Sequence, residues 1–270
     1  MIAQEIKDFI KNSFNKTNVI CLTGAGTSAE SGIPTFRGKG GLWEKYNPEI
    51  YANTEGLISV LRKHPQDLVN FIVDFYSVLL KAKPNPAHLA LSDLEKAGIL
   101  SSVITQNIDN LHQEAGSRNV IELHGNAFKI RCMRCSKSIK MEKERLKEMI
   151  ELLQLHRNSR IRLMQVLSHY FPRCHCGSRY RIDIVLFGEM LSQNELVRAY
   201  RHLDRCNVLL IVGSSLVVYP AANIPLYAKE RGAKLIEINN EKTAFSGLCD
   251  YRIRTKASEA CLEILELIKD

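Results

Sequence analysis

Short runs of apolar residues alternate with longer amphipathic stretches along most of this 270-residue chain. The runs have the length of buried strands, whereas the stretches between them repeat apolar residues at helical spacing. The predicted strands are Val19–Thr23, Ile99–Thr105, Val120–Leu123, Ile182–Phe187, Val208–Gly213, Leu235–Ile238 and Tyr251–Arg254. Because buried strands alternate with helices, we predict an α/β fold with a doubly wound, Rossmann-like parallel sheet.

Helix ends are marked by residues that favour caps. The predicted helices 87–97 and 220–231 both stop at a glycine. A third predicted helix, 192–204, lies between these two in the sequence. Ser192 and Glu195 have the spacing of a capping box at its start. Residues 141–170 contain neither glycine nor proline and predict a long charged helical stretch.

Two segments interrupt the alternation of strands and helices, and each is long enough for a small module of its own. Residues 38–83 form a helical module, and residues 128–182 form a module that contains four closely spaced cysteines. The sheet domain then comprises residues 1–37, 84–127 and 183–270.

Glycine and polar residues follow the ends of the predicted strands. They are Gly24, Gln106–Asp109, His124, Gly213–Ser215 and Asn239. The carboxyl ends of parallel strands line one crevice, in which ligands bind, so we expect these residues to form one site.

The loop after the first strand has a glycine pattern typical of dinucleotide binding. Gly24 would permit a tight turn, Gly26 would let backbone amides approach a pyrophosphate, and Ala29 would allow close packing of helix on strand. The acidic residue that clamps the ribose about twenty positions later in dehydrogenases is missing. A nucleotide here would therefore be held differently, and an ordinary glycine turn is the alternative.

The other polar residues each have two readings. Asn107 and Asp109 suit the ribose hydroxyls and carboxamide of a nicotinamide nucleotide, but such residues also serve as turn and cap residues. His124 suits a neutral general base or a packing role. Ser214, Ser215 and Asn239 suit phosphate and ribose, or a helix cap and a turn.

The eight cysteines divide into two groups. Cys132, Cys135, Cys174 and Cys176 form two close pairs, which predict a structural zinc ion with all four positions filled. His175 is an alternative ligand. The other cysteines, which are Cys21, Cys206, Cys249 and Cys261, lie in apolar patterns and are predicted to be core thiols.

Composition narrows the class of protein. No apolar run is long enough to span a membrane and the N-terminal residues lack a signal-peptide pattern, so we expect a cytoplasmic protein without a disulfide framework. The formal net charge is +8, and residues 129–181 hold fourteen Lys and Arg against four Asp and Glu. This basic segment suits nucleic acid, acidic protein tails or simply solvent, and we expect no direct nucleic-acid binding.

The motifs taken together resemble the sirtuin family of NAD-dependent protein-lysine deacylases, in the form of the single catalytic core of bacterial and archaeal members. The matching segments are GAGTSAESGIPTFRG (24–38), TQNIDNLH (105–112), ELHGN (122–126), FGE (187–189), GSSLVVYPAA (213–222), IN (238–239) and the cysteine pairs. The chain departs from the family pattern at Ile182, where proline is common, and in its C-x-C second pair.

The resemblance implies that the helical module and the zinc module together form a smaller second domain beside the sheet domain. It also implies a reaction and a set of site residues. NAD would serve as co-substrate in a protein-lysine deacetylase that releases nicotinamide, O-acyl-ADP-ribose and free lysine, with acyl-lysine proteins or peptides as partners. His124, Asn107 and Asp109 would be catalytic. NAD would contact Gly24, Ala25, Gly26, Ala29, Phe36, Arg37, Gln106, Asn107, Ile108, Asp109, His124, Gly213, Ser214, Ser215, Asn239 and Ala257. The zinc ligands would be Cys132, Cys135, Cys174 and Cys176, and the peptide would pair with Phe187 and Gly188.

The acyl group is expected to be neutral. Family members that prefer acidic acyl groups carry a Tyr-x-x-Arg motif, whereas this chain has Tyr76 followed by Leu79. Transfer of ADP-ribose to protein, plain NAD hydrolysis and a non-catalytic peptide or nucleic-acid reader remain alternatives.

Overall fold

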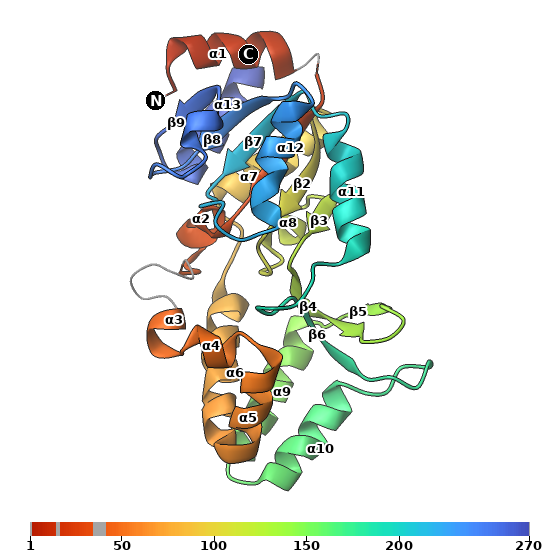
Figure 1. Ribbon diagram of the computed structural model, residues 1–270. Coiled ribbons are helices and arrows are strands. Elements are labelled where there is room, and N and C mark those ends of the chain that lie inside the picture. Colours follow the sequence, from red (N-terminus) through yellow and green to blue (C-terminus); the bar gives the residue numbers. More distant parts are fainter. Residues whose placement is uncertain (1, 15–16, 35–41, 270) are drawn as a thin grey trace. The chain divides into compact units, whose positions relative to one another are not determined.

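The computed structural model describes residues 2–14, 17–34 and 42–269 (Figure 1). The chain divides into two compact units. The first unit comprises residues 1–35, 83–124 and 191–270, and the second comprises residues 36–82 and 125–190.

The first unit is built on a six-stranded parallel sheet of described residues. Its strands are β1 (Val19–Thr23), β2 (Leu100–Thr105), β3 (Val120–Glu122), β7 (Val208–Val212), β8 (Lys234–Ile238) and β9 (Tyr251–Ile253). They lie in the order β3-β2-β1-β7-β8-β9, so the chain reverses its winding direction beside β1. The sheet is therefore doubly wound, as predicted from the sequence. Its switch point lies between β1 and β7, and sheets of this kind bind nucleotides at the switch point.

Helices cover both faces of this sheet (Figure 1). A buried hydrophobic cluster joins alternate strand residues such as Cys21, Leu210 and Ile236 to α1, α7 and α13. Across the sheet, α12 packs on β7 and β8 and α11 on β3. The helical segments of this unit are α1 (Gln4–Ser13), α2 (Ala25–Ser28), η2 (Ala29–Ser31), α7 (Pro86–Lys96), α8 (Leu111–Glu114), α11 (Gln193–Leu203), η3 (Ala221–Asn223), α12 (Ile224–Glu230), η4 (Ser246–Leu248) and α13 (Ala257–Lys269).

The second unit combines a helical layer with a small antiparallel sheet of order β5-β4-β6. Tyr76 of α6 is fully buried, and its hydroxyl donates to the Ala127 carbonyl at 2.9 Å. Helix α9 packs against α6. The elements are α3 (Leu42–Lys45), α4 (Pro48–Tyr51), α5 (Thr54–Lys63), α6 (Pro65–Lys81), β4 (Gly125–Cys132), β5 (Ser138–Lys140), α9 (Lys143–Leu155), α10 (Arg160–Tyr170) and β6 (Tyr180–Ile184).

Three local predictions were wrong. The charged stretch 141–170 is two helices, because Ser159 caps α10 by accepting a hydrogen bond from the Arg162 amide. Ser192 makes no cap hydrogen bond, whereas Asn85 and His88 form a capping box on α7. The strand predicted at 182–187 begins and ends earlier, at Tyr180 and Ile184, and belongs to the antiparallel sheet.

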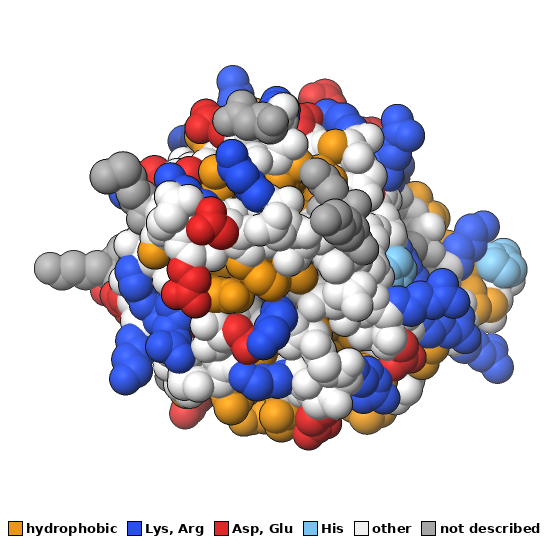
Figure 2. Space-filling model, turned by 90° about the horizontal axis from the view of Figure 1, so that it is seen from above, with side chains coloured by type: hydrophobic (Ala, Val, Ile, Leu, Met, Phe, Trp, Pro, Cys, Tyr) orange, Lys and Arg blue, Asp and Glu red, His pale blue; other side chains and the backbone are white. Residues whose placement is uncertain are grey.

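Surface charge is unevenly distributed. On the face that Figure 2 shows, acidic and basic side chains mix toward one side, and Lys and Arg predominate toward the other. Among the described residues, no helix combines the length and the apolar character needed to cross a membrane.

Candidate active site and metal centre

The ends of β1 and β7 approach each other so closely that side chains do not fit between them. A Cβ on Gly26 would lie 2.8 Å from the Gly213 carbonyl oxygen, and a Cβ on Gly24 would lie 2.8 Å from Ser214 Cα. Position 24 therefore requires glycine because Ser214 lies too close for a side chain. The backbone of Gly24 is extended, so the predicted tight turn is not the reason for the glycine. The Gly26 amide donates to the Gly213 carbonyl at 2.8 Å, so this amide is already used within the protein.

A buried polar cluster lies at the end of β2. The Ser28 hydroxyl donates to Asp109 Oδ2 at 2.6 Å, and Asn107 Nδ2 donates to Ser28 Oγ and to the Gly24 carbonyl, both at 3.0 Å. The Leu111 amide donates to the second Asp109 oxygen. Burial raises the pKa of Asp109, although these hydrogen bonds oppose the rise. The structure thus brings the predicted Asn107 and Asp109 together.

Two members of this cluster were missed by sequence reasoning. Ser28 links Asn107 to Asp109, and His88 Nε2 lies 3.4 Å from the Ser28 hydroxyl. Burial lowers the pKa of His88 to about 4, so the imidazole is neutral near pH 7. For Ser28, the only sequence signal was its position inside the glycine loop. For His88 there was no such signal, because it comes from α7, sixty residues away.

His124 is held in one orientation at the end of β3. Its Nδ1 lies 2.9 Å from the Gln106 carbonyl oxygen, which only accepts, so Nδ1 carries the proton. The buried Nε2 has no hydrogen-bond partner among the described residues, and burial lowers the pKa of this imidazole. A neutral ring with a free lone pair on Nε2 has the state that a general base needs. His112, by contrast, is fully buried, with Nε2 2.9 Å from the Thr23 hydroxyl, as expected for a structural residue.

A second chain of hydrogen bonds crosses the carboxyl edge of the sheet. Gln106 Nε2 donates to Ser214 Oγ at 2.8 Å, and Asn239 Nδ2 donates to the Ser214 carbonyl at 3.1 Å. The ends of β2, β7 and β8 therefore meet, as predicted for one crevice.

The remaining predicted NAD contacts differ in exposure. Ala25 and Ile108 are partly exposed, Ser215 is exposed, and Ala257 is buried at the start of α13. Ala29 is exposed, so the predicted close packing of helix on strand at this position was wrong. Phe36 and Arg37 lie outside the described residues.

In the second unit, Phe187 and Gly188 lie on a loop that an ion pair holds. The two terminal nitrogens of the Arg181 guanidinium, Nη1 and Nη2, donate to the two oxygens of the Glu189 carboxylate. This carboxylate also accepts from the Leu186 amide and the Thr54 hydroxyl. Burial pushes the pKa of Glu189 up, but these hydrogen bonds outweigh it and bring the pKa below its usual value. The Phe187 amide donates to the Ala52 carbonyl at 2.7 Å, and half of the Phe187 side chain is exposed.

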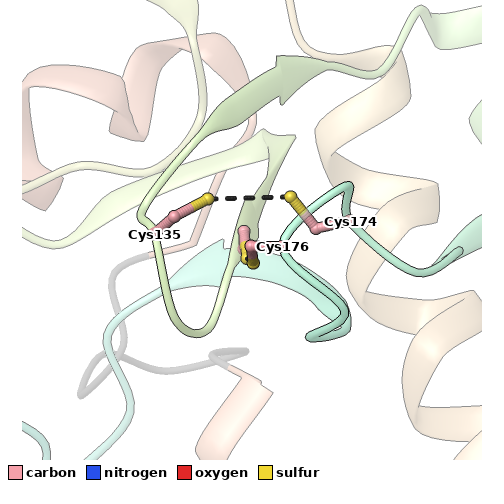
Figure 3. A group of neighbouring side chains, drawn as sticks. Cys135, Cys174 and Cys176 are labelled. Carbon is pink, nitrogen blue, oxygen red and sulfur yellow. Dashed lines mark hydrogen bonds between the residues drawn. The ribbon is translucent and has the colours of Figure 1, made fainter.

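The four predicted cysteine ligands converge on one point of the second unit. All four Sγ atoms lie within 4.8 Å of one another, with 3.4 Å between Cys132 and Cys176. The distance between Cys135 and Cys174, the pair joined by the dashed line in Figure 3, is 3.6 Å. Sulfurs around a tetrahedral zinc ion with Zn–S bonds of about 2.3 Å lie roughly 3.8 Å apart, so the donor set fits zinc. His175 lies outside this set, with Nδ1 3.3 Å from Cys174 Sγ. The other four cysteines are buried, as predicted.

The protein is similar to known proteins over nearly its whole length. The Sir2 family model matches residues 24–220. This chain belongs to the Sir2 family. The sirtuin resemblance read from the motifs is thereby confirmed.

Relatives and solved structures agree on this family. This sirtuin is 45% identical to the NAD-dependent protein deacylase of Pyrococcus furiosus, with 100% of this chain and 98% of the relative covered. The same identity holds for the Pyrococcus abyssi NAD-dependent protein deacylase, with 93% of each chain covered. A Sir2 homologue solved as an NAD complex has a TM-score of 0.78 and 37% identity, covering 100% of this chain and 94% of the other.

Proposed function

We infer that this sirtuin is an NAD-dependent protein deacylase that transfers an acyl group from lysine to ADP-ribose. Its full-length relatives are NAD-dependent protein deacylases. The observation in this chain that carries the inference is His124, whose Nδ1 is engaged by the Gln106 carbonyl and whose Nε2 is left free.

NAD is the co-substrate, and it supplies an electrophilic ribose carbon when nicotinamide leaves. Asn107, Asp109 and Ser28 present prepositioned polar groups, because their mutual hydrogen bonds fix each side chain before a ligand arrives. The Gln106, Ser214 and Asn239 chain would hold ribose and phosphate in the same manner. Both clusters come from strand ends at the switch point, where doubly wound sheets bind nucleotides.

His124 would remove a proton from a ribose hydroxyl through Nε2. Its lowered pKa keeps the ring neutral at physiological pH, and the Gln106 carbonyl stabilises the positive charge that develops at Nδ1–H. Asp109 accepts from Ser28 and the Leu111 amide, so it orients neighbouring groups.

The zinc ion is structural. Four cysteines fill all four tetrahedral positions, so no position remains for substrate or water. The ion would join the turns at 132–135 and 174–176, which flank β4 and β6.

Acyl-lysine peptides are the proposed partners, held by the loop that carries Phe187 and Gly188. The Phe187 amide is used by Ala52, so the peptide would pair with other backbone groups of this loop, such as the Gly188 amide, for which the described residues offer no acceptor. This loop is held by Arg181 and Glu189, which favours a fixed slot.

A neutral acyl group, acetyl first, is the proposed substrate. The Tyr76 hydroxyl donates to the Ala127 carbonyl and is fully buried, and Leu79 is buried beside it on α6. Neither residue offers a cation to an acidic acyl group, which needs a charged partner for strong binding.

The test incubates the purified protein with NAD and an acetyl-lysine peptide and quantifies all products by mass spectrometry. We expect nicotinamide, O-acetyl-ADP-ribose and free lysine peptide in equal amounts. His124→Ala should reduce peptide turnover by about 100- to 10,000-fold, because a positioned general base contributes that much. The matched control is His202→Ala, which removes another histidine of lowered pKa, on α11.

Three outcomes would contradict the proposal. Nicotinamide without the acetylated product would indicate NAD hydrolysis, and ADP-ribose attached to the peptide would indicate transfer to protein. Unchanged turnover in His124→Ala would remove this residue from its role.

A further inference from the structure

The helical hairpin of α9 and α10 exposes large apolar side chains that the fold does not use. Leu155 is 73% exposed, Ile161 is 75% exposed and Met164 is 41% exposed. Ile161 and Met164 are one turn apart on α10. They line a shallow depression of about 540 Å³ together with Arg160, Gln165 and Ser168.

Helix α10 already has a separate stripe that packs into the second unit. Leu163, Val166 and Tyr170 are its buried residues. A surface helix needs one apolar stripe to pack against its own core. Ile161 and Met164 therefore form a second stripe, which internal packing does not explain, and exposed apolar patches rimmed by polar residues mark interaction sites.

The stretch of sequence that carries this stripe contains only positive charges. The sequence contains no Asp or Glu between Glu151 and Asp183. Arg157, Arg160 and Arg162 are exposed, and no described carboxylate forms an ion pair with any of them.

The net positive charge of the chain comes from the same region. Residues 125–190 contain 14 Lys and Arg and 6 Asp and Glu, whereas the rest of the chain contains 23 of each. The entire formal net charge of +8 thus belongs to the segment that includes this hairpin.

We propose that the hairpin face, defined as Leu155, Arg157, Arg160, Ile161, Arg162 and Met164, docks an acidic amphipathic segment of a partner protein. Apolar side chains of the partner enter the depression on α10, where the flexible Met164 adapts to their shape. Carboxylates of the partner pair with the three arginines, whose planar guanidinium groups bind carboxylates through two hydrogen bonds.

The chemistry of the face favours polypeptide over nucleic acid or lipid. Single-stranded nucleic acid is bound by aromatic stacking beside a basic groove, and none of the six residues is aromatic. Membrane-binding helices insert a protruding apolar face, whereas Ile161 and Met164 line a depression.

The test measures binding of the zinc-loaded, 270-residue protein to a fluorescein-labelled 18-residue peptide by fluorescence anisotropy. The probe places leucine at helical spacing on one face and glutamate on the other. A scrambled peptide of the same composition, a duplex DNA and phosphatidylglycerol vesicles are compared in parallel. We expect the amphipathic peptide to bind most tightly and to lose affinity as salt is raised.

Two pairs of variants separate the apolar and the charged contributions. Ile161→Ser with Met164→Ser should weaken peptide binding by about 10- to 100-fold, because each lost apolar contact costs roughly a tenfold change. Arg160→Glu with Arg162→Glu should weaken it by a similar factor at low salt and by less at high salt. The matched controls, Leu262→Ser and Arg118→Glu, alter exposed residues of the first unit and should bind like the parent.

All hairpin variants should retain zinc and should turn over a short acetyl-lysine peptide at the parent rate. Equal binding of the scrambled peptide, tighter binding of DNA or vesicles, or unchanged affinity in both variant pairs would each overturn the proposal.

Discussion

The polar cluster at the sheet edge and the cysteine cluster of the second unit are organised in opposite ways. Asn107 and Asp109 lie 79 and 81 residues after Ser28 in the sequence, and all three side chains find their partners in the protein itself. The four cysteines come from two tight turns, and their sulfurs all lie within 4.8 Å of one another.

The fold alone holds the polar cluster in place, whereas the cysteine cluster must bind a metal ion before the sheet around it is stable. Hydrogen bonds and burial are sufficient to hold the polar cluster before NAD binds. Four thiolates held within 4.8 Å repel one another unless a cation lies between them. The sheet edge should therefore persist without ligand, whereas the small antiparallel sheet should depend on its metal.

The largest expected effect is the loss of zinc. Cys174→Ser, or extraction of the metal with a chelator, should unfold β4, β5 and β6, because structural zinc contributes about 10 kcal/mol or more to folding in small modules. Thermal unfolding by circular dichroism, with zinc content by mass spectrometry, measures this. Cys206→Ala, which alters a buried cysteine outside the cluster, should keep its zinc. A zinc-free protein with an unchanged melting temperature would contradict the comparison.

A smaller effect concerns acid and the buried histidine of the sheet edge. His88 has a pKa of about 4 in the folded protein, against about 6.5 when unfolded. At pH values between these two pKa values, the unfolded chain binds a proton that the native state does not. The free energy of unfolding therefore rises with pH across this range and reaches a plateau above about pH 6.5. For His88 alone this amounts to about 3 kcal/mol.

Urea unfolding at about pH 7.5 and about pH 5, with zinc content held constant, tests this linkage. His88→Gln should lose less stability between the two values than the parent, whereas exposed His64→Gln should behave like the parent. An equal loss in the His88 variant would show that another group carries the linkage.

The smallest expected effect concerns the ion pair of Arg181 and Glu189. It tests whether this pair, like the polar cluster at the sheet edge, holds its loop in place before a ligand binds. Arg181→Ala frees the loop of Phe187 and Gly188, and we expect the KM for peptide to rise about tenfold with kcat and the KM for NAD nearly unchanged, a loss of about 1.4 kcal/mol. Arg181→Lys should recover part of the affinity, and exposed Arg179→Ala is the control. An equal rise in the KM for NAD would indicate general damage instead.

The sheet was predictable because its strands are buried on both faces. β1 has the predicted bounds, and the ends of β2, β7 and β8 differ from prediction by a single residue. Apolar runs of this kind are local signals, and polar residues placed at their ends follow from the geometry of parallel strands. The zinc ligands were predictable for the same reason, since their spacing is local.

Features that depend on distant contacts were not predictable. His88 joins Ser28 only because α7 packs beside the glycine loop. The reason for glycine at position 24 is the approach of Ser214, 190 residues away in the sequence. The pattern of apolar and polar residues in one segment does not indicate which residues a distant segment places beside it.

The division of the chain has a consequence for how such enzymes diversify. Each part of the second unit leaves the first unit and returns to it, at residues 35 and 83 and again at residues 124 and 191. Both parts are thus insertions into loops of the six-stranded sheet, so residues can be gained or lost within them without changing the register of its six strands. The hairpin of α9 and α10 lies inside the second insertion. A family with this architecture can acquire new recognition surfaces by lengthening an insertion while its NAD chemistry stays constant.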